Sequence, residues 1–184
     1  MYKICIDPGH GGSDSGACGN GLRECDIALI VSRKVKNYLA AVGYEVIMTR
    51  TGDTDVYGVD ASATQELQAR CNISDNAGAD IFLSIHCNAA TAPEALGTET
   101  YYYALSTNGH KLAVGINKQL VGLGLVDRGV KSSPLYVTGH TDAVAALTEL
   151  AFISNADDGR KLGNKDWQDQ LARAVARGIT DYFA

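Results

Sequence analysis

No stretch of this chain is apolar for long enough to cross a membrane, and no part of it concentrates positive charge. Its 16 lysine and arginine residues are scattered and are outnumbered by 21 aspartate and glutamate residues, which gives a formal net charge of −5. Binding to nucleic acid needs a basic face for the phosphates, so a nucleic-acid partner is not expected. The nucleotide-binding motifs GxxxxGKS/T and GxGxxG are also absent, so the glycine-rich segments do not indicate a nucleotide site.

The five cysteines form no CxxC pair, and because their number is odd they cannot all be joined in disulfides. We therefore expect folding that does not depend on oxidation. Cys5 and Cys87 suit small, buried positions in strands. Three of the five cysteines lie close in sequence to the candidate site residues described below, so a thiolate metal ligand stays an alternative.

A length of 184 residues suits one domain with a single core, and 46% hydrophobic with 20% charged residues is typical of a globular protein. No internal repeat or low-complexity linker is present, so we expect residues 1–184 to form one domain, and we expect a monomer. The start of the chain lacks the basic and long apolar segments of a signal peptide. If the protein acts outside the cell, we expect release by lysis or an origin as a fragment of a larger secreted protein.

Short apolar runs alternate with segments of helical periodicity. Runs of strand length occupy residues 2–6, 44–49, 81–85, 98–104, 135–138 and 143–147. Apolar residues at three-to-four spacing predict helices over 27–42, 67–78, 112–120 and 167–179, and residues 52–64 and 91–97 resemble surface loops. This alternation predicts an α/β fold of three layers, with a mixed, mostly parallel sheet of about six strands flanked by helices.

Two histidines follow predicted strands directly. His10 stands in the turn DPGHGG after the first strand, and His86 ends the apolar run ADIFLSIH. The carboxyl ends of parallel strands share one edge of a sheet, so these side chains should meet there. Two histidines and a carboxylate are the minimal ligand set of a catalytic zinc. The alternatives are an incidental histidine or a phosphate-binding loop at His10, and a hydrogen-bonded core histidine at His86.

Several carboxylates compete for the third ligand position. Glu24 follows a Gly/Asn loop and precedes the first helix, but acidic residues are common at helix N-termini, where they favour the helix dipole. Asp14 and Asp26 are nearby rivals that spacing alone does not exclude.

Glu149 lies inside the apolar run AVAALTELAF. Burial there should desolvate the carboxylate and raise its pKa, which suits a group that shuttles protons. The alternative is a buried ion pair with Arg128 or Lys131. His140, in the loop TGHTD, is a candidate for contact with a substrate or a metal, and His110 is expected on a solvated helix face.

Eight segments occur in the order IDPGHGG, NGLRECDIAL, GYEVIMTR, ADIFLSIHCNA, GTETYYY, DRGVK, LYV and LTELAFISN, and they span nearly the whole chain. This ordered set resembles the zinc-dependent N-acetylmuramoyl-L-alanine amidases of the amidase type 3 family, found in bacterial autolysins and phage endolysins. The resemblance implies Zn²⁺ held by His10, Glu24 and His86, with Glu149 as the catalytic glutamate. It also implies hydrolysis, at the bacterial cell wall, of the amide between N-acetylmuramic acid and L-alanine in peptidoglycan.

The resemblance further implies that residues 1–184 are a single catalytic amidase domain without a wall-binding domain. Asn88, Arg128 and His140 are the expected substrate contacts. The chain departs from the family pattern in lacking a proline before the run that contains Glu149, and in carrying Ala151 where a glycine is usual. A metallo-exopeptidase and a non-catalytic wall-binding module are the competing functions.

Overall fold

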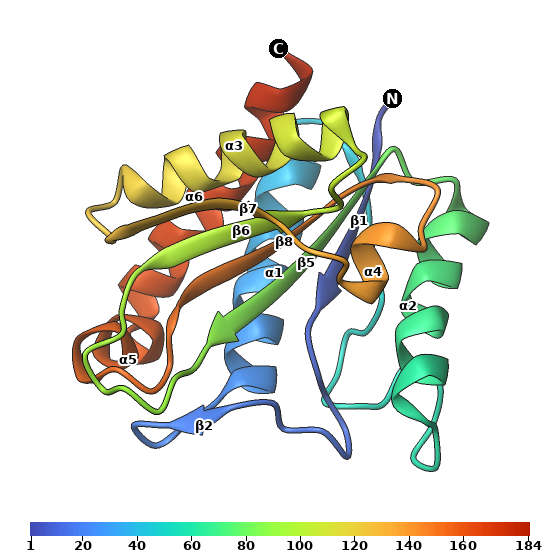
Figure 1. Cartoon of the computed structure of the whole chain (residues 1–184). Helices are drawn as coiled ribbons and strands as arrows, with labels where there is room; N and C mark the ends of the chain where they lie inside the picture. Colours follow the sequence, from blue (N-terminus) through green and yellow to red (C-terminus); the bar gives the residue numbers. More distant parts are fainter.

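A six-stranded sheet runs through the centre of the molecule (Figure 1), and the computed structural model describes all 184 residues. In spatial order its strands are β4 (Glu45–Met48), β1 (Lys3–Pro8), β5 (Ile81–Asn88), β8 (Val144–Phe152), β6 (Thr98–Tyr102) and β7 (Asp127–Ser132). The first four run parallel to their neighbours, β6 is antiparallel to β8, and β7 is parallel to β6. The predicted α/β fold with a mixed, mostly parallel sheet is confirmed.

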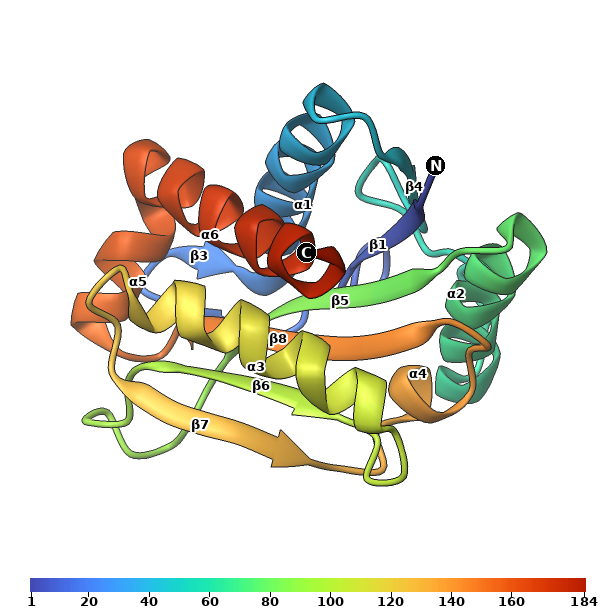
Figure 2. The same cartoon turned by 90° about the horizontal axis from the view of Figure 1, so that it is seen from above.

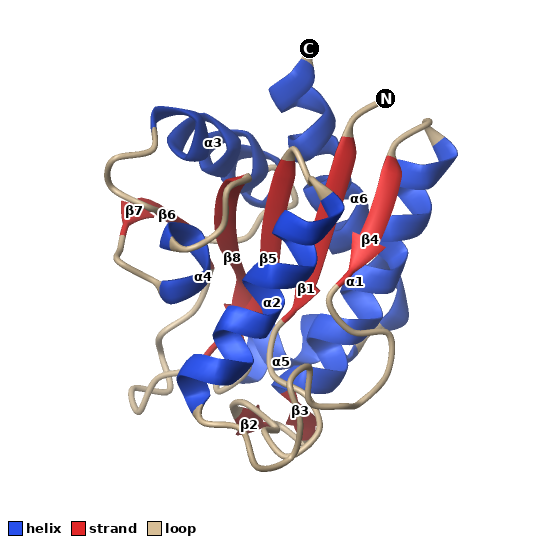
Figure 3. Ribbon diagram, turned by 90° about the vertical axis from the view of Figure 1, so that its right-hand side faces the viewer, coloured by secondary structure: helices blue, strands red, loops and turns tan.

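Helices cover both faces of the sheet (Figures 2 and 3). The helices are α1 (Glu24–Ala41), α2 (Ala63–Ala77), α3 (Thr107–Val121), α4 (Tyr136–Gly139), α5 (Ala156–Gly163) and α6 (Lys165–Phe183). None of them combines the length and the hydropathy that crossing a membrane requires.

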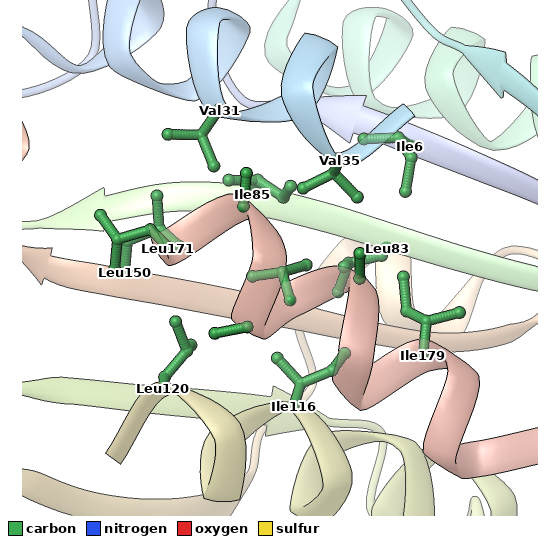
Figure 4. Close-up of a cluster of buried hydrophobic side chains, with 14 of the residues drawn as sticks. Ile6, Val31, Val35, Leu83, Ile85, Ile116, Leu120, Leu150, Leu171 and Ile179 are labelled. Atoms are coloured by element: carbon green, nitrogen blue, oxygen red, sulfur yellow. The ribbon is translucent and has the colours of Figure 1, made fainter. Parts of the chain in front are cut away.

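The larger apolar core lies on the face covered by α1, α3 and α6 (Figure 4). There, Leu83 and Ile85 of β5 pack with side chains such as Val35, Ile116 and Ile179 from the three helices. Strand residues alternate between faces, so the intervening residues of the same strands point toward α2 and α4. That second face carries a small apolar cluster and a row of polar side chains: the cluster is Cys5, Cys71, Phe82, Val137, Ala145 and Leu147, and the polar residues are Asp7, Ser84, His86, Glu99 and Glu149.

One predicted strand is wrong. Instead of a strand at 135–138, the chain forms the short helix α4 (Tyr136–Gly139), which begins after Leu135 and whose Val137 and Thr138 are buried. A short, mostly apolar run such as LYVT does not distinguish a strand from a helical turn, because both bury such residues. The sixth strand is instead β7, with the sequence DRGVKS, which carries no apolar alternation because it is an exposed edge strand.

Other elements were predicted only in part or not at all. Helix α5 follows Asn155, whose side chain accepts hydrogen bonds from the N–H groups of Asp157 and Asp158. Helix α2 begins within the predicted loop, at a capping box formed by Ser62 and Gln65. A two-stranded hairpin, β2 (Cys18–Gly19) and β3 (Leu22–Arg23), is joined by an Asn–Gly turn, which is a strong hairpin signal in a sequence.

Candidate metal centre

His10 lies in a strained turn at the end of β1. Its φ of 57° is in the left-handed region, which a residue with a side chain adopts only when its surroundings impose it. Two buried arginines hold the turn in this conformation. Arg50 donates hydrogen bonds to the carbonyl oxygens of Pro8 and Gly9 at 3.0 and 2.7 Å, and Arg70 donates to the carbonyl oxygen of His10 at 2.8 Å. The turn is therefore fixed before any ligand binds.

Glycines on both sides of His10 make room for the site. A Cβ atom on Gly9 would lie 2.3 Å from the His86 ring. A Cβ atom on Gly16 would lie 2.6 Å from Glu24 Oε2 and from the His10 ring, and the φ of Gly16 is 63°. Only glycine permits this close approach of backbone to the three side chains.

His10, Glu24 and His86 converge from three separate elements: the turn after β1, the first residue of α1 and the end of β5. Glu24 Oε1 lies 3.1 Å from His10 Nε2 and 2.9 Å from His86 Nδ1. One donor atom from each of the three residues lies within 4.8 Å of the other two, and Glu24 is buried. No cysteine belongs to this cluster, and Cys5 and Cys87 are buried strand residues as predicted.

The surrounding groups orient the three donor atoms. Asp14 Oδ2 lies 2.6 Å from His10 Nδ1, so an N–H at that nitrogen points to the carboxylate and Nε2 faces Glu24. The backbone N–H groups of Cys87 and Ala17 donate to the two oxygens of Glu24, at 3.0 and 2.8 Å. Asp14 thus lies outside the cluster as a partner of His10.

The other rival carboxylate, Asp26, lies away from the histidines and pairs with Arg23 at 2.7 Å. Cys25, Asp26 and Asp53 form a second group of possible donor atoms. Arg23 donates to both aspartates and so already supplies the positive charge there.

The charges of the cluster shift the pKa values of its own residues. Burial alone would lower the pKa of His10, but Glu24 and Asp14 outweigh it and raise that pKa to about 9. Burial alone would raise the pKa of Glu24, but hydrogen bonds from His10 and His86 hold it well below its usual range. Two imidazole nitrogens and one carboxylate oxygen are the donor set of a catalytic zinc, and the convergence of these atoms fits such an ion.

Glu149 lies beside this cluster in the middle of β8, paired with His86 of β5. Its Oε2 atom is buried and has no hydrogen-bond partner. Burial raises the pKa of Glu149 to about 7; His86 opposes the shift, and the carboxylates of Glu24 and Glu99 add to it. The expected desolvation is therefore present, and the alternative ion pair with Arg128 or Lys131 is not formed.

Glu99, which the sequence did not single out, is the partner of those two cations. It lies on β6 opposite Glu149 and is 3% exposed. Glu99 accepts hydrogen bonds from Asn88 at 2.6 Å, Tyr101 at 2.6 Å, Arg128 at 3.0 Å, and Lys131. In the segment TETYY, Glu99 lies between two threonines, a pattern that is typical of strand residues facing solvent. The sequence therefore did not indicate that Glu99 is buried.

A cavity of about 290 Å³ adjoins the cluster on the side of α2 and α4. Its wall includes His10, His86, Tyr136 and the buried ion pair of Arg70 with Asp7 at 2.8 Å. His140 does not join the metal cluster. Its ring stacks on Tyr136 at 3.9 Å and its Nδ1 lies 2.9 Å from the Tyr136 carbonyl oxygen.

Known proteins resemble this chain in sequence and in fold. Over 183 residues the chain is 39% identical to N-acetylmuramoyl-L-alanine amidase LytC of Bacillus subtilis (strain 168), an alignment that covers 98% of this chain and 35% of LytC. The germination-specific N-acetylmuramoyl-L-alanine amidase of the same strain is 34% identical over 187 residues, which cover 98% of this chain and 79% of that protein. This chain thus spans about a third of the length of LytC and most of the second relative.

The structural match is equally extensive. The solved catalytic domain of CwlV, an N-acetylmuramoyl-L-alanine amidase from Bacillus (Paenibacillus) polymyxa, has a TM-score of 0.89 and 33% identity to this chain. The match covers 100% of this chain and 98% of that domain. Residues 4–181 also match the family model described as N-acetylmuramoyl-L-alanine amidase. The chain therefore belongs to the N-acetylmuramoyl-L-alanine amidase family.

Proposed function

We propose that this chain uses a zinc ion held by His10, Glu24 and His86 to hydrolyse the amide between N-acetylmuramic acid and L-alanine in peptidoglycan. The observation that carries the proposal is the convergence of three donor atoms beside the unpaired carboxylate of Glu149. Family membership supports the choice of the scissile bond. The proposed partner is therefore the peptidoglycan of the bacterial cell wall.

Each residue has a separate task in the proposed reaction. His10, Glu24 and His86 would hold a zinc ion, which when bound would supply the Lewis acidity that activates water and stabilises negative charge on the scissile carbonyl oxygen. Glu149 Oε2 is free to accept the proton of the attacking water, because no protein group occupies it. The same carboxyl then donates that proton to the leaving nitrogen of L-alanine, and a pKa of about 7 suits both transfers.

The residues proposed as substrate contacts lie on two sides of the candidate site. Asn88 and Arg128 contact Glu99 on the side of β6 and β7. His140 stacks on Tyr136, which lines the cavity on the side of α4.

Product analysis on purified peptidoglycan tests this function. We expect new amino groups of L-alanine to appear without new reducing sugars. The Glu149→Gln protein is the matched control for contaminating hydrolases. It should release neither amino groups of L-alanine nor reducing sugars above background. New reducing ends, or amino groups of another residue, would show that the chain cleaves a different bond.

A further inference from the structure

Two cations share one buried carboxylate at the edge of the candidate site. Glu99 is fully occupied by four donors, two of which are the side chains of Arg128 and Lys131. The two positive charges against one negative charge leave this group of three side chains with a net charge of +1. The chain as a whole has a net charge of −5, so this is a local excess of positive charge in an acidic protein.

Both cations are held in place and are also accessible. Arg128 uses Nε to contact Glu99, and its guanidinium lies 4.7 Å from the centre of the Phe152 ring. Its two terminal nitrogens have no protein partner, and its side chain is 36% exposed. Lys131 lies 5.9 Å from the centre of the Tyr101 ring and is 40% exposed. A guanidinium with two free nitrogens on a fixed stem suits bidentate binding of a carboxylate.

The position of this pair relative to the reacting groups follows from the strand order. His86 on β5, Glu149 on β8 and Glu99 on β6 lie on successive strands, and the two cations lie on β7. Adjacent strands are about 4.8 Å apart, so Glu99 lies one strand beyond Glu149, on the side away from His86. The charged groups of Arg128 and Lys131 reach back from β7 to contact Glu99, so they lie about one strand spacing from Glu149. The opposite end of the site, at the cavity near α2, is richer in carboxylates: it is lined by Asp7, Asp14 and Glu66, together with Arg70 and His10.

The chemistry of a muramyl peptide matches this polarity. The lactyl carboxyl group of N-acetylmuramic acid is consumed in the scissile amide, so the glycan next to that bond is neutral. The free carboxylates lie on the stem peptide, and the first belongs to the residue that follows L-alanine. Two residues of extended peptide span about 7 Å, which is enough to cross the one strand spacing between Glu149 and the cations at Glu99.

We propose that Arg128 and Lys131, positioned by Glu99, bind a carboxylate of the stem peptide on the leaving-group side. The peptide then runs across β6 and β7, and the glycan extends toward α2. This inference rests on the proposed amidase function and adds the direction in which the substrate lies.

Two soluble muramyl peptides whose other carboxyl groups are amidated test the subsite, one with a free α-carboxylate on the second stem residue and one with a carboxamide there. The measured quantity is the ratio of their kcat/KM values. We expect the wild-type protein to prefer the carboxylate about tenfold, the effect of one charge-assisted contact at a partly exposed site. Arg128→Gln should bring the ratio close to one, with Lys131→Gln as the second variant if the first does not fold.

Two further variants separate positioning from structure. Arg177→Gln, an exposed arginine paired with Asp181 on α6, should keep the wild-type ratio. Glu99→Gln turns an amide donor toward the cations, so it should reduce the ratio severalfold while the carboxamide peptide is still cleaved. A structural role for Glu99 would lower kcat/KM for both peptides equally, and that result would remove Glu99 from the proposal.

The outcomes distinguish this inference from the function on which it rests. Failure to release the L-alanine amino group from either peptide would refute the amidase function itself. Cleavage of both peptides with equal efficiency by the wild-type protein would refute the carboxylate subsite alone. An Arg128→Gln protein that keeps the full preference would also refute it.

Discussion

The carboxyl group of Glu149 is the proposed base, and its ionisation in a buried position should also destabilise the folded state. Glu149→Gln should retain the fold and the bound metal, because the amide is nearly isosteric. It should lose about 10²–10⁴-fold in turnover, since an amide does not accept the proton of the attacking water. Rates on a soluble muramyl peptide, with metal content measured on the same preparation, check this. Near-wild-type turnover would place the base elsewhere.

Stability gives a second, independent readout of Glu149. A buried acid whose pKa is raised from 4.5 to about 7 destabilises the folded state when it ionises. This penalty is absent below pH 4.5, grows as the pH rises, and is complete above pH 7. Metal-free Glu149→Gln should therefore be more stable than the wild-type protein at pH 8, by up to about 3 kcal/mol, and similar to it at pH 4.5. Urea denaturation at the two pH values measures the difference, and an equal difference at both would contradict the shift.

Zinc binding should depend on pH through His10. Its pKa of about 9 means that its imidazole is protonated at pH 7 in the metal-free protein, and a metal ligand must be deprotonated. Zinc should therefore displace a proton at pH 7, and its apparent affinity should rise up to about tenfold per pH unit between pH 7 and 9. Calorimetry in buffers of different ionisation enthalpy counts the released protons. His86→Ala should abolish tight binding, and wild-type protein that holds no zinc after metal-replete preparation would refute the site.

Residue types and spacing predicted some residues of the candidate site but not others. His10 and His86 stood out because each follows an apolar strand, and Glu149 stood out because a carboxylate inside an apolar run is unusual. Choosing Glu24 over Asp14 and Asp26 required the family resemblance, since spacing alone left all three open. The structure places Asp14 against His10 and Asp26 against Arg23, which are side-chain directions that a sequence does not record.

At the scale of elements, the buried ion pair of Asp7 with Arg70 links β1 to α2 beneath the turn of His10. Both side chains are almost fully buried, and Arg70 also donates to the carbonyl oxygens of Pro8 and His10. Arg70→Met should lower the free energy of unfolding by about 3–5 kcal/mol, because it leaves the charge of Asp7 uncompensated. Arg177→Met, which removes an exposed pair, should cost less than about 1 kcal/mol. Urea denaturation compares the two, and equal effects would show that the buried pair is not what joins these elements.

The elements that the sequence predicted well are those with long periodic patterns. Helices α1 and α6 each show apolar residues at three-to-four spacing over more than three turns, so their packing face is evident. The short elements α4 and β7 were not predicted, because their conformation depends on tertiary contacts. Val137 of α4 is buried against the second apolar cluster, and β7 pairs with β6 despite its charged sequence.

At the scale of the whole molecule, the two faces of the sheet have different tasks. One face packs a continuous apolar core against three helices, which gives the strands a rigid support. The other face carries Asp7, Ser84, His86, Glu99 and Glu149 at alternating strand positions. Strands buried on both faces are normally apolar throughout, so polar residues at every second position are the unusual feature of this sheet and indicate the face of the candidate site.

The overall charge should act against binding to intact walls. The chain carries −5 and bacterial walls carry anionic polymers, so long-range electrostatics should slow the approach to the substrate. The Debye length falls from about 14 Å at 50 mM salt to about 7 Å at 200 mM salt, which screens this repulsion. We therefore expect hydrolysis of intact walls to accelerate over that range.

The carboxamide muramyl peptide is the control for this effect, since it lacks the carboxylate that would bind Arg128 and Lys131. Its hydrolysis should be insensitive to salt, because neither the repulsion by wall polymers nor the local attraction to the subsite acts on it. Hydrolysis of the carboxylate peptide should slow modestly as salt screens its contact with the subsite. If intact walls are instead cleaved more slowly at 200 mM salt, an attractive surface must outweigh the net charge, and the cations on β7 would be the first to substitute.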